Sequence, residues 1–213
     1  MARERKTMRI IAGDFKGRHV DPVPGEGTRP TTDRVREAMA SSVISNHDDG
    51  FEGASVLDAF AGSGALGIEA LSRGARHCTF VDVDRKAIKT IEGNLANLPL
   101  ARGQASVVNG DVLSILRPSM LDGAPYDIVF LDPPYATATS DVAAFLKMLV
   151  ERDALAGDSL VIYEKASGKG SKRKLKDALP PEVEEMTGLL EGLFALVGVK
   201  QYGATQVVYL ERI

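Results

Sequence analysis

Short apolar runs alternate with amphipathic stretches along most of this 213-residue chain, and this alternation constrains the fold more than any other feature. Runs of strand length lie at 54–60, 77–83, 105–110, 126–132 and 158–164. Helical periodicity is found at 65–73, 85–97 and 140–152. Strands that alternate with helices predict an α/β fold with a mainly parallel sheet covered on both faces. Ligands bind such folds beyond the carboxyl ends of the strands, so we expect the functional residues there.

Both ends of the chain depart from the alternation. Residues 8–23 predict a small hairpin, and 32–46 predict a helix that Thr31, Thr32 or Asp33 would open. A helical insert is expected around 182–196, and the last sixteen residues read as two strands joined at Gly203, which would close the sheet with an antiparallel hairpin. We therefore divide the chain into an N-terminal basic extension, 1–53, and an α/β domain, 54–213, which would hold the functional site.

Composition argues against several classes of protein. No apolar run approaches the length of a membrane span, and the stretch MARERKTMRI lacks the apolar region of a signal peptide, so we expect a cytoplasmic protein with no membrane partner. The sequence has one cysteine, Cys78, and three scattered histidines without ligand spacing. We therefore expect no metal.

Positive charge is concentrated in two segments, although the net charge is −3. Residues 1–36 hold nine lysines or arginines and five acidic residues, a balance of +4. The tract 165–176 has six positive residues and no acidic one, and it includes Lys172, Arg173 and Lys174. Such clusters suit phosphate groups but also occur in solvated loops. Our hypothesis is that these three side chains contact a nucleic-acid backbone.

The stretch VLDAFAGSGALG (56–67) has the spacing G-x-G-x-x-G at Gly62, Gly64 and Gly67, and Asp82 lies twenty residues after Gly62. Alone, this pattern is typical of a fold that binds a nicotinamide dinucleotide. However, Asp58 ends the preceding strand, where it would repel a pyrophosphate and attract the ammonium or sulfonium of S-adenosylmethionine. Asp82 could accept hydrogen bonds from the ribose hydroxyls. We expect Asp84 to cap the next helix.

The fourth strand ends in FLDPPY (130–135), which resembles the [N/D]-P-P-[Y/F/W] motif of methyltransferases that act on exocyclic amino groups. The stretch DAFAGSGALGIEAL resembles their cofactor loop. Together with TRPTTDRVRE (28–37) and RIIAG (9–13), these motifs are similar to the RsmD-type guanine-N2 methyltransferases of bacterial small-subunit (16S) ribosomal RNA. The resemblance covers 8–164 and the closing strands, whereas 165–200 departs from the family pattern.

This resemblance implies a Rossmann-like class I methyltransferase fold, S-adenosylmethionine as cofactor, and 16S ribosomal RNA as partner, within a 30S particle or an assembly intermediate. It implies that Asp111 accepts a hydrogen bond from the adenine amino group, although Asp111 could instead cap a helix. It also implies that the segment RPTTDR folds over the active site. We expect Arg34 to contact the cofactor, and Thr31 and Arg36 to contact the RNA; the alternative is a solvated helix.

The DPPY motif also suits amino-group chemistry. The lone pair of the guanine 2-amino group is delocalised into the ring, so hydrogen bonds must favour its pyramidal form before it can attack. Asp132 and the carbonyl of Pro133 can accept two such bonds, Pro134 helps to fix their backbone, and Tyr135 offers a ring for base stacking. We expect direct methyl transfer without a covalent intermediate, and we expect Cys78 to lie in the core.

Two other functions remain open from the sequence. A DNA methyltransferase acting on adenine N6 or cytosine N4 would use the same DPPY chemistry, but it normally needs a larger recognition region than residues 1–53 and 165–200 offer. A nicotinamide-dependent oxidoreductase would need a residue for hydride transfer. The pattern Tyr-x-x-x-Lys is absent, and none of the three histidines follows a core strand.

Overall fold

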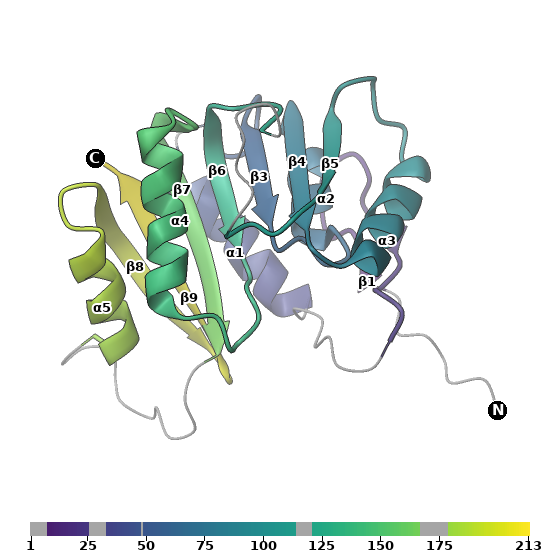
Figure 1. Cartoon of the computed structure of the whole chain (residues 1–213). Coiled ribbons are helices and arrows are strands. Elements are labelled where there is room, and N and C mark those ends of the chain that lie inside the picture. Colours follow the sequence, from purple (N-terminus) through teal and green to yellow (C-terminus); the bar gives the residue numbers. More distant parts are fainter. Residues whose placement is uncertain (1–7, 26–32, 48, 114–120, 167–178) are drawn as a thin grey trace.

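A computed structural model describes residues 8–25, 33–47, 49–113, 121–166 and 179–213. Within these residues, seven strands form one sheet with the order β5-β4-β3-β6-β7-β9-β8 (Figure 1). The strands are β3 (Ser55–Ala59), β4 (His77–Asp82), β5 (Ala105–Asn109), β6 (Tyr126–Leu131), β7 (Leu155–Ala166), β8 (Phe194–Tyr202) and β9 (Thr205–Arg212). The first five strands in chain order pair in parallel, and β9 pairs antiparallel with both β7 and β8. The predicted α/β fold with a closing hairpin is confirmed.

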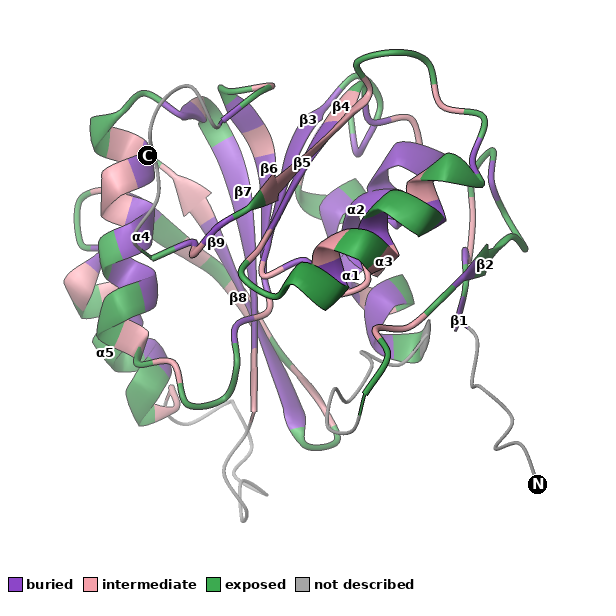
Figure 2. Cartoon of the chain, turned by 45° about the vertical axis from the view of Figure 1, so that its right-hand side comes forward, coloured by how far each residue is buried: buried purple, intermediate pink, exposed green. Residues whose placement is uncertain are grey.

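Helices cover both faces of the sheet (Figures 1 and 2). The helices are α1 (Asp33–Asn46), α2 (Ala65–Ser72), α3 (Arg85–Ala96), α4 (Thr139–Glu151) and α5 (Pro181–Leu189). Helices α1, α2 and α3 lie on one face, and α4 and α5 lie on the other. Because the sheet is buried between these layers, its strands are apolar on both sides, as the sequence predicted.

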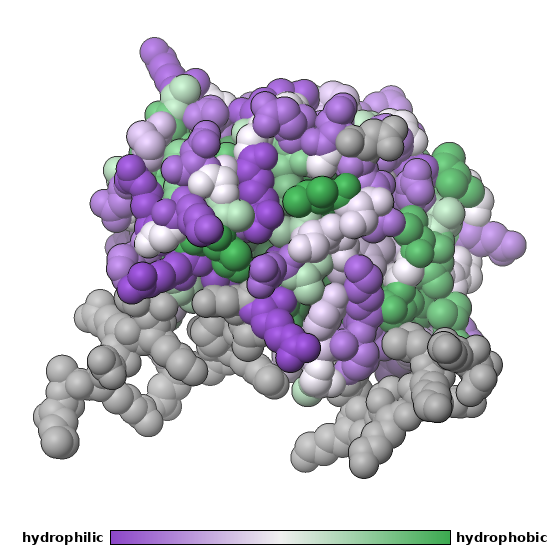
Figure 3. Space-filling view, turned by 180° about the vertical axis from the view of Figure 1, so that it is seen from behind, coloured by the Kyte–Doolittle hydropathy of each residue, from purple (hydrophilic) through white to green (hydrophobic). Residues whose placement is uncertain are grey.

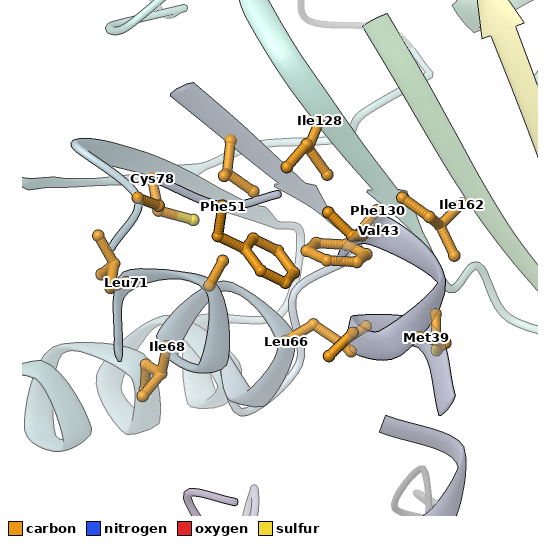
Figure 4. Packing of buried hydrophobic residues seen from close by; sticks show 14 of the residues in the cluster. Met39, Val43, Phe51, Leu66, Ile68, Leu71, Cys78, Ile128, Phe130 and Ile162 are labelled. Carbon is orange, nitrogen blue, oxygen red and sulfur yellow. The ribbon is translucent and has the colours of Figure 1, made fainter. Parts of the chain in front are cut away.

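The N-terminal extension shares a core with the rest of the protein. Its two short strands, β1 (Met8–Arg9) and β2 (His19–Val20), pair antiparallel as the predicted hairpin. Met39 and Val43 of α1 lie in the same hydrophobic cluster as Phe130 of β6 and Ile162 of β7 (Figure 4). The division of the chain at residue 53 stays a prediction, but the two parts are packed together.

Backbone and side-chain hydrogen bonds fasten the extension to α2. The carboxylate of Glu69 accepts hydrogen bonds from the backbone N–H groups of Ile11 (2.9 Å) and Ala12 (3.1 Å). The Ser72 hydroxyl accepts another from the N–H of Phe15 at 2.9 Å. Buried polar groups need partners, so these bonds fix where residues 11–15 can lie.

The predicted helical insert is wrong at its end. We expected helix to residue 196, but α5 ends at Leu189 and strand β8 begins at Phe194. Gly192 has φ of 75°, a left-handed conformation that turns the chain and that glycine adopts without strain. Phe194 is then buried as the first residue of β8. Strand β7 also begins earlier than expected, at Leu155.

The rear surface is mostly hydrophilic, with separate hydrophobic spots (Figure 3). None of the helices formed by the described residues combines the length and apolar character needed to cross a membrane.

Candidate active site

A cavity of about 520 Å³ lies at the carboxyl ends of the parallel strands, within the usual size range of small-molecule sites. Figure 1 shows the arrowheads of β3, β6 and β7 pointing towards this lower edge of the sheet. The cavity is lined by Met8, Pro22, Val23, Arg36, Asp58, Phe60, Ala61, Gly62, Ser63, Ala65, Leu66, Asp82, Val83, Asp84, Ala87, Asp111, Val112, Asp132, Pro133, Pro134, Tyr135 and Glu164. Most of the site residues expected from sequence therefore face one space.

The glycine loop connects β3 to α2 at one end of this cavity. Gly62 has φ of 56°, a left-handed conformation, and its N–H donates a hydrogen bond to Asp82 Oδ2 at 2.8 Å. A Cβ on Gly67 would lie only 2.3 Å from the Phe80 ring, so the close packing of α2 on β4 requires glycine there. Gly64 is the N-cap residue of α2 and does not line the cavity.

Asp82 ends β4 and organises the turn around it. Its Oδ2 accepts from Gly62 N–H, and its Oδ1 accepts from the N–H of Asp84 at 2.8 Å. Asp84 in turn accepts from the N–H of Lys86 at 2.9 Å, which confirms its expected role as the cap of α3. Each Asp82 oxygen retains a lone pair, so the carboxylate can still accept hydrogen bonds from a ligand.

Asp58 is buried in the floor of the cavity, with 2% of its surface exposed. Its Oδ2 accepts a hydrogen bond from the N–H of Gly67 at 2.9 Å. Burial raises the pKa of the Asp58 carboxyl from 3.8 to about 8, and the negative charges of Asp132 and Asp82 add to the rise. A positively charged group bound beside Asp58 would favour its ionised form. This environment therefore suits a cationic ligand.

The DPPY segment lines the cavity directly after β6. Asp132, Pro133, Pro134 and Tyr135 all contribute to the wall. The Tyr135 side chain is 60% exposed, which is unusual for a large aromatic residue and leaves its ring accessible to a partner. The position of these residues agrees with the expectation from sequence, and their roles stay predictions.

Asp111 follows β5 and also lines the cavity. Its Oδ1 accepts a hydrogen bond from the N–H of Leu113 at 3.0 Å, so it stabilises the local turn. A carboxylate can accept several hydrogen bonds, and a contact with adenine stays a prediction.

The two arginines at the start of α1 lie differently. Arg36 lines the cavity, is 1% exposed, and donates from Nη2 to the carbonyl of Arg9 at 3.0 Å. Arg34 is exposed and does not belong to the cavity wall. Two residues rotate a helix by about 200°, so side chains at this spacing point to nearly opposite sides. Thr31, Lys172, Arg173 and Lys174 lie outside the described residues.

Several residues of the cavity wall were missed by sequence reasoning. Met8, Pro22 and Val23 reach it from the N-terminal extension, and Glu164 reaches it from β7. Glu164 carried a signal, because an acidic residue at the end of an apolar strand, as in LVIYE, needs a reason to be there. The N-terminal residues carried none, since their place depends on contacts distant in sequence.

Asn94 of α3 joins the glycine loop to the N-terminal extension. Its Oδ1 accepts from the N–H of Asp21 at 2.9 Å, and its Nδ2 donates to the carbonyls of Asp21 and Ser63, both at 3.0 Å. Asn94 is buried, so these bonds are shielded from water. One side chain therefore positions both Ser63 and the residues just before Pro22 and Val23.

Metal binding and cysteine chemistry find little support in the described part of the chain. Within it, no group of three or more histidine, cysteine, aspartate or glutamate side chains could hold a metal ion. Cys78 is buried in the core, and burial raises the pKa of its thiol well above the ordinary value (Figure 4). A neutral buried thiol is a poor nucleophile, in agreement with the core position expected for Cys78.

Comparisons with known proteins identify the family. The model of the family described as "Conserved hypothetical protein 95" matches residues 8–179. The chain belongs to this family. Ribosomal RNA small subunit methyltransferase D from Escherichia coli K12 is 40% identical over 158 residues, which cover 74% of this chain and 74% of that protein. The resemblance to RsmD-type methyltransferases is confirmed. The family match continues to residue 179 and so includes the Lys-rich tract that we expected to depart from the family pattern.

Solved structures support the same fold class. The structure of the Escherichia coli protein yhhF has a TM-score of 0.72 and 33% identity, covering 97% of this chain and 98% of that one. The magnesium protoporphyrin IX methyltransferase of Synechocystis PCC 6803, solved with bound SAM, has a TM-score of 0.61 at 18% identity, with 89% and 87% coverage. This chain thus has the Rossmann-like fold of class I methyltransferases.

Proposed function

We propose that this protein uses S-adenosylmethionine to methylate the exocyclic N2 amino group of a guanine in bacterial 16S ribosomal RNA. The observation that carries the proposal is the single cavity that joins the glycine loop, Asp58 and Asp82 to the DPPY segment. One end of this cavity has groups suited to a cationic nucleoside, and the other has groups suited to an amino group.

The residues at the cofactor end fit S-adenosylmethionine. Asp82 would accept hydrogen bonds from the ribose hydroxyls, while Asp111 and the exposed Val83 would contact the adenine. Asp58 would face the positive charge of the methionine moiety, which compensates for the cost of ionising a buried carboxyl. A pyrophosphate would instead meet the acidic side chains of Asp58 and Asp82. When bound, the cofactor would supply a methyl group attached to a positively charged sulfur.

The DPPY segment would prepare the amino group for attack. Asp132 and the Pro133 carbonyl would accept hydrogen bonds from the 2-amino group and direct its lone pair towards the methyl carbon. Tyr135 would stack on the base and hold it over the cavity. As the bond from the nitrogen to the methyl carbon forms, the bond from that carbon to sulfur would break and leave a neutral thioether. The nitrogen must also lose a proton, which the Asp132 carboxylate would accept.

The identity of the substrate rests on the family. The Escherichia coli relative is named a small-subunit ribosomal RNA methyltransferase, and this chain shares its sequence over most of both lengths. The substrate would be 16S RNA within a 30S particle or an assembly intermediate, in the bacterial cytoplasm. The N-terminal basic segment, with Thr31, and the tract with Lys172, Arg173 and Lys174 would bind phosphates.

A comparison of substrates tests this proposal. Purified protein is incubated with labelled cofactor and naked 16S RNA, 30S particles or duplex DNA, and the products are digested to nucleosides. We expect N2-methylguanosine from the RNA or the particle. N6-methyladenine from DNA as the main product would contradict the proposal and favour a DNA methyltransferase.

A further inference from the structure

Glu164 is a buried carboxylate in the cavity that methyl transfer, as described above, does not use. Only 4% of its surface is exposed, and it lines the cavity together with the DPPY segment. Alternation along β7 places it on the same face as Leu160 and Ile162, which belong to the core under α1. A carboxylate can accept several hydrogen bonds, so contacts within the protein leave it able to accept another from a ligand.

The sheet register brings Glu164 beside Asp132. Strands β6 and β7 are parallel neighbours, and Leu131 pairs with Tyr163. Asp132 follows the last residue of β6, and Glu164 follows Tyr163 within β7, so each lies one residue beyond this pair, where the two strands run about 4.8 Å apart. Both side chains line the same cavity. Two acidic residues thus follow neighbouring positions of the sheet and line the same cavity as the DPPY segment.

Guanine offers two adjacent donors to such a pair. Its N2 amino group carries hydrogens, and the neighbouring N1 carries one more. Adenine differs at this place, because its N1 has a lone pair and no hydrogen. Asp132 alone could hold an amino group of either base, whereas a second carboxylate beside it would attract the guanine edge and repel the adenine edge.

We propose that Glu164 accepts the N1–H of the target guanine and thereby selects guanine over adenine. This inference rests on the proposed function, because it assigns the base specificity of the same site. Glu164 acts as a specificity-determining residue that contacts the substrate base, while Asp132 serves the reacting amino group.

A positively charged side chain lines the same cavity as Glu164 and Asp132. Arg36 is the only lysine or arginine among the described residues of the cavity wall, and α1, which carries it, packs against β7. A buried positive charge in the same cavity reduces the cost of placing two acidic residues there. The ionised form of Glu164 is the one that accepts a hydrogen bond from N1–H.

Replacement of the target guanine by 2-aminopurine isolates this contact, because 2-aminopurine keeps the 2-amino group but has a lone pair at N1. The base is placed at the mapped position of the RNA substrate, and single-turnover methylation is measured for wild type and Glu164→Gln. We expect wild type to prefer guanine over 2-aminopurine by about a hundredfold, because the Glu164 carboxylate would face the N1 lone pair of 2-aminopurine. The glutamine amide can donate to N1, so the preference should fall by about tenfold or more in the variant.

Three controls keep this test decisive. Glu211→Gln removes a carboxylate from β9 outside the cavity wall and should keep the wild-type preference. Calorimetric titration with S-adenosylmethionine should show unchanged affinity in Glu164→Gln, because the residue faces the base. If that variant does not fold, Glu164→Asp replaces it, and the shorter carboxylate should slow methylation of guanine without improving that of 2-aminopurine.

The outcomes separate this inference from the proposed function. Equal losses on guanine and 2-aminopurine in Glu164→Gln, with an unchanged preference, would show that Glu164 only supports the fold. Absence of N2-methylguanosine with the wild-type protein would instead overturn the proposed function, and the specificity assignment with it.

Discussion

The two ends of the cavity are built in different ways. At the cofactor end, β3, the glycine loop and β4 come from residues 55–84, and short hydrogen bonds join Gly62 to Asp82 and Gly67 to Asp58. At the target end, Met8, Arg36 and Glu164 come from segments far apart in the chain. A local motif therefore defines the first end, whereas tertiary packing defines the second. We expect substitutions at the two ends to have separable effects on cofactor binding and on methylation.

The largest expected effect is on the chemical step. Asp132→Ala should slow single-turnover methylation by roughly a hundredfold to a thousandfold, because a hydrogen-bond acceptor that acts in the transition state is lost. The rate is measured as label transferred to RNA at saturating cofactor. Normal turnover in this variant would show that Asp132 has no role in methyl transfer. It would also contradict the separation of methylation from cofactor binding between the two ends.

The second prediction concerns Asp58 and pH in the ligand-free protein. Because the folded-state pKa of Asp58 is raised to about 8, its contribution to stability is complete below the unfolded-state value and is lost as pH rises towards 8. Asp58→Asn keeps an acceptor for the Gly67 N–H but cannot ionise. At pH 8.5 this substitution should raise the free energy of unfolding by roughly 2 kcal/mol. The value is smaller than the full pKa difference would give, because water that enters the cavity partly solvates the ionised carboxyl.

Thermal or denaturant unfolding at a series of pH values checks this prediction. The advantage of Asp58→Asn should shrink as pH falls and should vanish below the unfolded-state pKa of 3.8, where the wild-type carboxyl is protonated in both states. A constant difference across this range would argue against a raised pKa. With S-adenosylmethionine present, the order should reverse, because the ligand's positive charge favours the ionised aspartate.

The third prediction addresses the target end alone. Tyr135→Ala should weaken binding of the RNA substrate by roughly 1 to 3 kcal/mol, the contribution of one base stack, and should leave cofactor affinity unchanged. The RNA affinity is measured by filter binding or fluorescence anisotropy under conditions in which no methyl transfer takes place. Equal RNA affinity for variant and wild type would argue against stacking on the exposed ring.

The smallest effect should come from Asn94, and it should reach both ends. Asn94→Ala removes bonds to Asp21 and Ser63, so we expect cofactor and RNA affinity each to fall by about threefold to tenfold, the equivalent of one or two hydrogen bonds. Asn97→Ala at the C-cap of α3 is the matched control, since its side chain bonds only to the carbonyl of Gly93 among the described contacts. An effect on one ligand alone would show that Asn94 does not couple the ends.

The sequence predicted the sheet and the position of the glycine loop beside Asp82 well because those features are local. Strand periodicity, the spacing of Gly62 and Asp82, and the cap at Asp84 depend on neighbours within about twenty residues, and each was found as expected. Helical phase was the first failure. Arg34 and Arg36 were both assigned to ligands, but a helix turns by about 200° over two residues, and only Arg36 reaches the cavity.

Long-range packing explains the other failures. Glu164 and Met8 face the cavity because β7 neighbours β6 and because Glu69 and Ser72 hold residues 11–15 against α2. No local sequence pattern indicates that these residues, which are far apart in the chain, come together. The early start of β8 was missed because Gly192 permits a turn inside a stretch that otherwise has helix-forming residues.

Cofactor titration of two variants tests the division of the cavity most directly. By calorimetry, wild-type protein should bind S-adenosylmethionine, Asp82→Ala should bind it about tenfold to a hundredfold more weakly, and Asp132→Ala should bind it within about twofold of wild type. This result would place the cofactor at the glycine loop and leave the DPPY segment for the base. Equal weakening in both variants, or tight binding of NADH with no binding of S-adenosylmethionine, would contradict the account.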